Sequence, residues 1–320
     1  MITEKVKDNS ALRRYLEEKR ALVDRCLIRL LGAQERYPLT LYQSMHYSLC
    51  AGGKRIRPIL SIASSEAVGG TLEDVIRAAV AIEMIHTYSL IHDDLPAMDN
   101  DDIRRGKPTN HKVFGEAAAI LAGDALLTLA FSILSDNSAW GDVENQHDRW
   151  KGFSGEKIGS ANILRIIHEI ALSAGPEGMV GGQQLDIESE GKSIDIKDVE
   201  KMHGRKTGAL ILAAVRAGGI AGGATETQLT ALTDYGKKIG LAFQIADDIL
   251  DVEGKVEDIG KSVGKDVKQH KNTYPAIIGS SESRVIAKRL VDEAIAALER
   301  FDERADPLRM IAEYIVARKS

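Results

Sequence analysis

Two acidic clusters in the sequence place carboxylates close enough together to act as pairs. The first cluster contains Asp93, Asp94 and Asp99, and the second contains Asp247 and Asp251. On a helix, the two aspartates of the second cluster would lie about one turn apart on the same face. A proline within the first cluster would end a helix there and let the chain bring Asp99 back towards Asp93. Each cluster is therefore expected to present paired carboxylates.

Carboxylates this close repel each other unless a cation lies between them. Two unit charges about 4 Å apart repel by about 4 kcal/mol at an effective dielectric constant of about 20. All-oxygen ligands with no cysteine nearby favour a hard divalent ion, and Mg²⁺ combines one or two carboxylates with phosphate oxygens of a substrate. A solvated helix face is the alternative explanation of a single acidic cluster. Because both clusters adjoin apolar runs, the sequence instead predicts a magnesium site that lines a cleft.

Basic side chains occur in groups that could bind the phosphate groups of such a substrate. The guanidinium fork of arginine suits phosphate oxygens, and lysine acts as a point charge. The basic residues are Lys54, Arg55 and Arg57, then Arg104 and Arg105, then Lys261, Lys265, Lys268 and Lys271, with Lys206 apart from them. Any one pair would ordinarily be a surface charge, but the combination with paired carboxylates and an apolar helix predicts a site for a phosphorylated apolar molecule. Two histidines near the first acidic cluster are candidate ligands, although His86 is expected to donate a hydrogen bond and His92 to cap or pack.

The elements that position these residues are expected to be helices, which makes the fold class all-α. The sequence has only 7 prolines and little strand-like alternation, and Ala, Leu, Ile, Glu and Lys recur at helical spacing. Helices are predicted over residues 73–92, 116–134, 163–173, 206–217, 227–252 and 284–305. Glycine pairs mark turns or close backbone approaches, and none is long enough for a linker, so residues 1–320 are expected to form a single domain. Residues 135–160 lack a clear period and are expected to form a surface excursion between helices.

The charge balance and composition argue against several classes of protein. The 320 residues carry 42 basic and 47 acidic side chains, a formal net charge of -5, so no global positive field exists for nucleic acid or an anionic membrane. Cys26 and Cys50 have neither metal-ligand spacing nor the density of a disulfide scaffold, which favours free thiols in a reducing cytosol. The N-terminal residues show no apolar leader, and charged residues interrupt the later apolar stretches. A cytoplasmic protein without membrane insertion is therefore expected.

Six motifs that contain these residues occur in the order in which one enzyme family carries them. The motifs are GGKRIRP at 52–58, HTYSLIHDDLPAMD at 86–99, RRGKPT at 104–109, GGQ at 181–183 followed by Asp186, KTG at 206–208 and FQIADDILD at 243–251. Together they resemble the trans-prenyltransferases of the polyprenyl synthetase family, in particular bacterial farnesyl diphosphate synthases and their geranylgeranyl-producing relatives. The resemblance implies an isoprenoid-synthase-type bundle of helices around a deep central cavity, usually as a homodimer. It also implies an enzyme that joins an allylic diphosphate to isopentenyl diphosphate.

The same resemblance implies a role for each matching residue. The Mg²⁺ ligands would be Asp93, Asp99 and Asp247, with three ions when substrate is bound and Mn²⁺ as a substitute. Support for these ligands, or metal binding through water, would come from Asp94, Asp186 and Asp251. The allylic diphosphate would contact Arg104, Lys206, Thr207, Gln244 and Lys261. Isopentenyl diphosphate would contact Gly53, Lys54, Arg57, His86 and Arg105, with Lys271 as a further substrate-binding residue. The residues expected to be catalytic are Asp93, Asp94, Asp99, Asp247 and the five contacts of the allylic diphosphate.

The expected reaction begins when the C–O bond of the allylic diphosphate breaks, because metal ions and cationic side chains stabilise the leaving diphosphate more than the ester. The double bond of isopentenyl diphosphate then attacks the allylic cation, and a proton is lost to the released diphosphate, as the family resemblance implies. The growing tail would run past Ser89, roughly 5 Å behind Asp93 on the same helix. Tyr88 resembles the bulky residue that stops growth in bacterial C15 synthases. The predicted product from dimethylallyl and geranyl diphosphates is therefore (E,E)-farnesyl diphosphate.

Three alternatives stay open. A geranylgeranyl diphosphate synthase would use the same chemistry to make a C20 product. A class I terpene cyclase shares the metal-triggered ionisation, but it would leave the basic cluster at 52–58 and Arg105 without a second diphosphate to bind. A non-catalytic regulatory subunit would not need two intact acidic motifs, and a Ca²⁺-binding EF-hand loop would need a glycine and a terminal glutamate that are absent.

Overall fold

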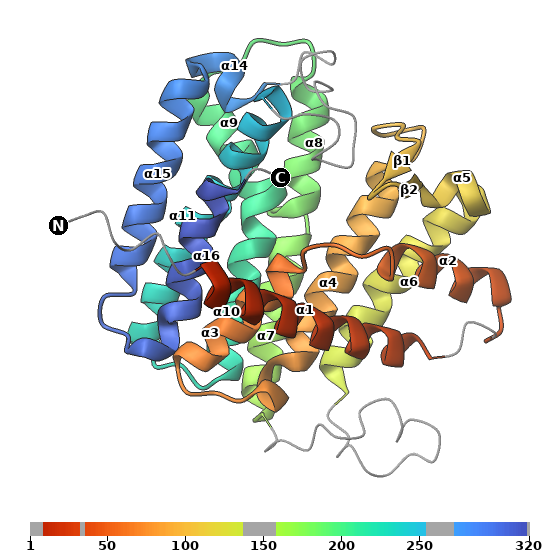
Figure 1. The fold of residues 1–320 in the computed structure, drawn as a ribbon. Helices are drawn as coiled ribbons and strands as arrows, with labels where there is room; N and C mark the ends of the chain where they lie inside the picture. The colour runs from red at the N-terminus through yellow and green to blue at the C-terminus, as the bar shows by residue number, and fades with distance from the viewer. Residues whose placement is uncertain (1–8, 33–35, 137–157, 254–271, 319–320) are drawn as a thin grey trace.

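The computed structural model describes residues 9–32, 36–136, 158–253 and 272–318, and these residues form a bundle of helices (Figure 1). The longer helices are α1 (Asn9–Leu31), α2 (Leu39–Leu49), α3 (Ile56–Ala67), α4 (Leu72–Asp93), α6 (Glu116–Ser135), α7 (Ser160–Ala174), α8 (Met179–Ser189), α10 (Ala209–Ala221), α11 (Glu226–Glu253), α15 (Ser280–Ala297) and α16 (Asp306–Ala317). The shorter elements are α5 (Asn110–Phe114), α9 (Ile196–His203), the π turn η1 (Gly204–Gly208), α14 (Tyr274–Ile278) and the 3₁₀ turn η2 (Glu303–Ala305). The strands described are β1 (Ile103–Arg104) and β2 (Lys107–Pro108), which pair antiparallel in a two-stranded hairpin. The prediction of an all-α fold is confirmed.

Helix α10 lies at the centre of the bundle, where it contacts α3, α4, α7 and α11. Its sequence is apolar on nearly every face, as expected for a helix surrounded by other helices. Close packing against α3 requires a glycine, because a Cβ at Gly218 would lie 2.0 Å from the carbonyl oxygen of Ser61. The glycine pair at residues 218–219 therefore marks a close approach of two backbones and not a turn. Helix α1 lies across one face of this bundle (Figure 1).

Helix α4 carries the first acidic cluster at its C-terminal end. The helix begins at a capping box, in which the Asp74 carboxylate accepts hydrogen bonds from the backbone N–H and the hydroxyl of Thr71 at 2.8 Å. It ends three residues before Pro96, since proline disfavours helical backbone in the residue that precedes it and cannot donate to the helix. The chain then turns back, and the N–H of Asp99 donates to the carbonyl oxygen of Asp93 at 2.8 Å. The predicted return of Asp99 towards Asp93 is confirmed.

Two predicted helices differ most from the structure at their ends. The helix predicted over 206–217 is preceded by the π turn η1, so residues 206 and 207 belong to that turn and α10 begins at residue 209. The helix predicted over 284–305 begins earlier and ends at Ala297. A separate turn follows it, in which the Asp302 side chain caps η2 by accepting from the N–H of Arg304. The predicted surface excursion at 135–160 falls mostly outside the described residues.

Helix α6 is unusual in being strongly apolar and yet incompletely covered. Within the described residues, it is the one helix that is long and apolar enough to cross a membrane by length and composition. One side packs against α2 and α4, and only 39% of its most apolar 18-residue window is buried. The other side exposes Ile120 and Leu121. Apolar surface that is exposed in this way is typical of protein interfaces.

Candidate active site

The end of α4 brings two carboxylates of the first acidic cluster into one electrostatic environment. Asp93 is partly buried, and burial raises the pKa of its carboxyl to about 6. The Lys206 ammonium opposes this rise, whereas the neighbouring Asp99 carboxylate adds to it. A buried carboxylate beside a second one is stabilised by a cation that binds both. The cluster is therefore suited to a divalent metal ion.

Asp94 has different surroundings from Asp93, although the two are adjacent in sequence. Its side chain is buried, and Arg104 of β1 donates from Nε to both of its oxygens at 2.7 and 2.9 Å. The Nη2 group of Arg104 also lies 2.6 Å from an Asp94 oxygen and 3.7 Å from Asp101. Asp94 thus ties the β1–β2 hairpin to the end of α4. In this arrangement the guanidinium of Arg104 is bound to carboxylates, and its contact with a diphosphate stays a prediction.

The second acidic cluster lies on α11, at the same end of the bundle as the first (Figure 1). The Asp247 side chain is 40% exposed, and its carboxylate accepts a hydrogen bond from Nη2 of Arg318 at 2.8 Å. Asp251, which the sequence predicts to lie on the same helix face as Asp247, is buried. The two carboxylates are therefore not equally accessible to solvent. Asp248 is also buried, and it accepts from Gln244 at 2.8 Å. Of these carboxylates, Asp247 is the one placed to meet a ligand.

Arg318 is a site residue that the sequence analysis missed. It follows α16 close to the C-terminus, and its side chain is only 4% exposed. Besides the Asp247 carboxylate, its guanidinium lies over the ring of Phe243, 4.2 Å from the centroid. A lone arginine outside every motif carries no signal in the sequence. Its partner is 71 residues away along the chain and becomes a neighbour only in the fold.

The π turn η1 brings Lys206 and Thr207 to the acidic clusters. Lys206 donates to the Asp186 carboxylate of α8, and its charge also acts on Asp93. The approach of α8 to η1 requires glycine, because a Cβ at Gly182 would lie 2.2 Å from the backbone nitrogen of Lys206. Thr207 donates to Oε1 of Gln244 on α11 at 2.6 Å. The four predicted residues therefore form two hydrogen-bonded pairs. Lys206 with Asp186 lies beside the first acidic cluster, and Thr207 with Gln244 lies beside the second.

Arg57 and His86 form the centre of the predicted isopentenyl diphosphate site. Nη1 of Arg57 lies 3.3 Å from Nε2 of His86. Burial and the nearby arginines, Arg57 first among them, lower the pKa of His86 well below its usual value, so the imidazole is neutral. His86 accepts this hydrogen bond through Nε2 because a guanidinium can only donate, so the predicted donation by His86 would come from Nδ1 and stays a prediction. Nε of Arg57 is buried and has no hydrogen-bond partner among the described residues, which favours an anionic ligand here.

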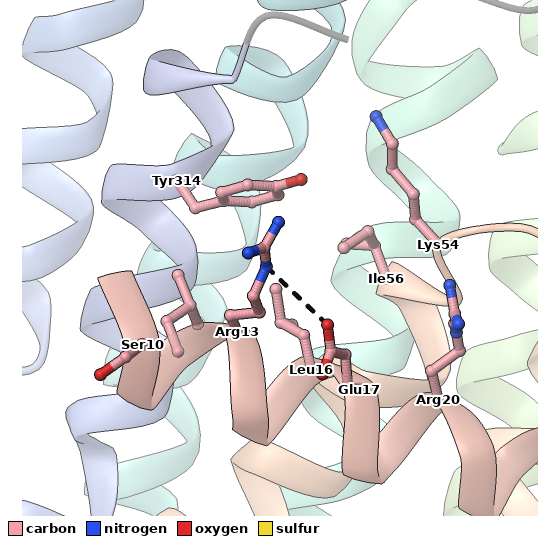
Figure 2. A pocket seen from close by; sticks show the side chains of 9 residues that line it. Ser10, Arg13, Leu16, Glu17, Arg20, Lys54, Ile56 and Tyr314 are labelled. Carbon is pink, nitrogen blue, oxygen red and sulfur yellow. Dashed lines mark ion pairs between the residues drawn. The ribbon is translucent and has the colours of Figure 1, made fainter. Parts of the chain in front are cut away.

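Lys54 connects the second acidic cluster to a pocket at the edge of the bundle. Figure 2 shows this pocket between α1, the start of α3 and α16; its volume is about 520 Å³. Its lining includes Arg13 and Arg20 of α1 and Tyr314 of α16. Burial and Arg318 lower the pKa of Lys54, and Asp247 opposes this effect. Lys54 therefore lines the pocket while its charge interacts with the Asp247 carboxylate.

Arg55 does not belong with the phosphate-binding basic residues, contrary to its grouping in the sequence analysis. Its side chain is 1% exposed and donates from Nη1 to Glu83 at 2.6 Å and from Nε to Asp24 at 2.8 Å. Nη2 donates to the carbonyl oxygen of Leu49 at 2.6 Å. The backbone of Arg55 is left-handed, with φ of 53°. Arg55 thus fixes the segment that carries Lys54 and precedes α3.

Arg105 also contacts this segment. Its Nη1 group donates to the carbonyl oxygen of Gly52. A Cβ at Gly53 would lie 2.8 Å from the Arg105 guanidinium, and the backbone φ of 132° at this position favours glycine. Burial lowers the pKa of Arg105, and the Glu83 carboxylate opposes this effect. The predicted members Gly53 and Arg105 of the isopentenyl diphosphate site are therefore adjacent.

The predicted chain-length residues lie one turn behind the first acidic cluster. Tyr88 is 7% exposed, and burial together with the charge of Asp93 raises the pKa of its hydroxyl. Its ring packs edge-to-face against the His92 imidazole, with centroids 5.6 Å apart and an interplanar angle of 79°. The prediction that His92 packs is confirmed. The Ser89 hydroxyl donates to the carbonyl oxygen of His86 at 2.9 Å and so is held along the helix.

The donor set fits a metal that is completed by its substrate. Among the residues that the structure describes, no group of three or more Asp, Glu, His or Cys side chains gathers at one point. The carboxylates lie near one another in smaller sets, such as Asp93 with Asp99, and one or two carboxylates with phosphate oxygens are the usual ligands of Mg²⁺. Lys261 and Lys271 lie outside the described residues, so their roles and that of the lysine-rich segment stay predictions.

Comparisons with known proteins decide the family. The model of the polyprenyl synthetase family matches residues 38–313. The chain belongs to the polyprenyl synthetase family. It is therefore a prenyltransferase, and the family implies isopentenyl diphosphate and allylic diphosphates as substrates.

Relatives of this prenyltransferase carry names for different product lengths. It is 44% identical over 308 residues to a farnesyl diphosphate synthase of Geobacillus stearothermophilus, covering 96% of this chain and 98% of the relative. It is 45% identical over 313 residues to a geranylgeranyl diphosphate synthase of Cyanophora paradoxa, covering 98% of each. The apo structure of an FPP/GFPP synthase from Zymomonas mobilis superimposes with a TM-score of 0.81 at 38% identity, covering 95% of this chain and 99% of that one. Product length is thus not decided by similarity.

Proposed function

We propose that this prenyltransferase makes (E,E)-farnesyl diphosphate from dimethylallyl, geranyl and isopentenyl diphosphates. The observation that carries the product length is the buried ring of Tyr88, one turn behind the carboxylate of Asp93. A chain that grows from a diphosphate held at Asp93 meets this ring as it extends along α4. A bulky, well-packed ring at this depth limits the product to C15.

Residues of α4, η1 and α11 bind and ionise the allylic diphosphate in this proposal. Asp93, Asp99 and Asp247 would hold Mg²⁺, which when bound supplies positive charge to the diphosphate oxygens. Lys206 adds a positive charge beside Asp93, and Gln244 lies in the same region through its bond to Thr207. Positive groups fixed before the reaction stabilise the departing diphosphate more than the intact ester, so they accelerate C–O cleavage.

The isopentenyl diphosphate is bound on the side of α3 in this proposal. Lys54 and Arg57 provide cations, and Nε of Arg57, which has no hydrogen-bond partner in the described part of the chain, provides a buried donor for a phosphate oxygen. The neutral His86 accepts from Nη1 of Arg57 and so orients the guanidinium. Both Lys54 and Arg57 interact with the charge of Asp247, which supports a second diphosphate site next to the first.

Truncating Tyr88 should lengthen the product. Tyr88→Ala removes the ring that blocks the tail, so the main product should shift from C15 to C20 or longer, while Tyr88→Phe keeps the bulk and should keep C15. The measurement is the carbon number of the products formed by purified protein from dimethylallyl and isopentenyl diphosphates with Mg²⁺. A wild-type C20 product would instead favour the geranylgeranyl alternative. Diphosphate release without isopentenyl diphosphate would favour a terpene cyclase.

We also propose that the enzyme is a homodimer formed through the exposed side of α6. The support is the apolar sequence of this helix together with its low burial, since Ile120 and Leu121 are 43% and 59% exposed. Exposed apolar surface of this kind is typical of protein interfaces. Leu121→Glu should convert the dimer to a monomer in mass measurements across a concentration series, whereas Thr230→Ala, at an exposed position of α11, should not. A wild-type protein that is monomeric at every concentration would contradict the dimer.

The remaining parts of the proposal concern location and partners. A cytoplasmic location is supported by Cys26 and Cys50, both of which are free thiols. The acidic net charge argues against nucleic acid as a partner.

A further inference from the structure

His92 connects the chain-length residue Tyr88 to helix α6. The two side chains are four residues apart on α4, and their rings meet edge-to-face. The other side of the imidazole reaches α6, where Nε2 lies 3.0 Å from the carbonyl oxygen of Ile120. Because a carbonyl oxygen only accepts, Nε2 carries the proton and donates it. The imidazole is therefore fixed between the tyrosine ring and the backbone of α6.

Gly123 provides the space that this imidazole occupies. A Cβ at Gly123 would lie 2.1 Å from Nε2 and 2.6 Å from Cδ2 of His92, so any larger residue would displace the ring. Gly123 lies inside α6, where glycine is less favourable than alanine by about 1 kcal/mol. Glycine at this position thus lowers helix stability but leaves space, and the group that fills the space is the imidazole that packs against the Tyr88 ring.

We propose that His92 is a positioning residue that sets the product length by holding the Tyr88 ring in the path of the growing chain. This inference rests on the proposed function, because it requires that Tyr88 end the tail-binding cavity. An aromatic ring can limit the depth of a cavity only if neighbouring groups hold it in one orientation. The Tyr88 ring is held in this way by the imidazole of His92, and the imidazole is held by its hydrogen bond to Ile120 and its packing on Gly123.

The expected consequence is one further round of the same reaction when the support is removed. In that round the C1–O bond of farnesyl diphosphate breaks, C1 bonds to C4 of isopentenyl diphosphate, and the lost proton leaves with the released diphosphate. His92→Ala lets the tyrosine ring turn into the vacated space, so the share of C20 and longer products should rise at least tenfold over the wild type. Gly123→Ala should have the same effect from helix α6, because its methyl group would displace the His92 imidazole.

The decisive experiment is a double-mutant comparison of product lengths. If His92 acts through Tyr88, His92→Ala should lengthen the product in the wild-type background and add nothing in the Tyr88→Ala background. Thr230→Ala, at an exposed position of α11, is the control and should leave the product unchanged. A variant that is merely destabilised would lose C15 product without gaining longer ones.

Two results would overturn the inference while leaving the proposed function intact. One is an unchanged product profile in both His92→Ala and Gly123→Ala. The other is an equal lengthening by His92→Ala with and without the tyrosine ring. Binding of geranylgeranyl thiolodiphosphate with Mg²⁺ gives a readout that does not depend on turnover, and His92→Ala should tighten it at least fivefold. A wild-type C20 product would contradict the farnesyl proposal, whereas His92→Ala should still lengthen the product relative to the wild type.

Discussion

Asp93→Asn is expected to stabilise the metal-free protein at neutral pH and to abolish its prenyltransferase activity. Burial raises the pKa of the Asp93 carboxyl from 3.8 to about 6, so the fold disfavours its ionised form. Each tenfold change in proton affinity corresponds to about 1.4 kcal/mol, which gives a cost of up to about 3 kcal/mol for an ionised Asp93. Asparagine is close in shape and carries no charge, so it removes this cost.

The pH dependence of stability provides the check on the sign. Between about pH 4 and pH 6 the folded protein holds the Asp93 proton more tightly than the unfolded chain does. The free energy of unfolding contributed by this group therefore falls as the pH rises through that window and stays low above it. Urea unfolding in EDTA at pH 4.5 and pH 7.5 should show this loss in the wild type and much less of it in Asp93→Asn. Asp234→Asn, at an exposed position of α11, is the control and should unfold like the wild type.

The prenyltransferase activity of Asp93→Asn should fall, although its stability at neutral pH should rise. Without the Asp93 carboxylate the allylic diphosphate loses part of its metal-binding site, and the turnover number should fall about 10³-fold or more at saturating Mg²⁺. An Asn variant that is active, or one that is less stable than the wild type at pH 7.5, would argue against the assigned role of Asp93. A carboxylate that destabilises the metal-free protein and yet is required for turnover is typical of a cation-binding site.

The fold could be predicted where helical periodicity is strong. The helices over 73–92, 116–134 and 227–252 end within two residues of α4, α6 and α11 in the structure, because long apolar stripes determine them. The π turn at 204–208 could not be predicted from helical periodicity, because its position depends on the close approach of Gly182 to the backbone of Lys206. The end of α15 depends on a turn capped by Asp302, which is a local hydrogen bond and not a pattern.

The site could be predicted as far as its residues are contiguous in motifs. The return of Asp99 to Asp93 followed from a proline in a short segment. By contrast, the bond of Arg318 to Asp247 joins residues 71 positions apart, and no spacing rule connects them. Sequence neighbours can also have unlike roles, since the backbone conformation of Arg55 sends its side chain into the protein while Lys54 lines the pocket.

Replacing Arg55, in the segment before α3, should strongly lower the free energy of unfolding. Arg55 and Glu83 form an ion pair at 2.6 Å in which the side chains are 1% and 2% exposed. Breaking a buried pair from one side leaves the other charge without compensation, and Arg55→Met should therefore lower the free energy of unfolding by about 3–5 kcal/mol. Arg55→Lys keeps the charge but loses the fork that also reaches Asp24 and the Leu49 carbonyl oxygen, so its loss should be intermediate.

The double variant separates an unpaired charge from lost packing. If the cost of Arg55→Met comes from the isolated Glu83 carboxylate, then adding Glu83→Gln should recover part of it, and the two losses will not add. The loop before α3 also carries Lys54, so Arg55→Lys should raise the KM for isopentenyl diphosphate several-fold while the KM for the allylic substrate stays near its wild-type value. Urea unfolding and steady-state kinetics on the same preparations measure both effects. Additive losses in the double variant, or equal changes in the two KM values, would mean that Arg55 serves general packing and not the isopentenyl diphosphate site.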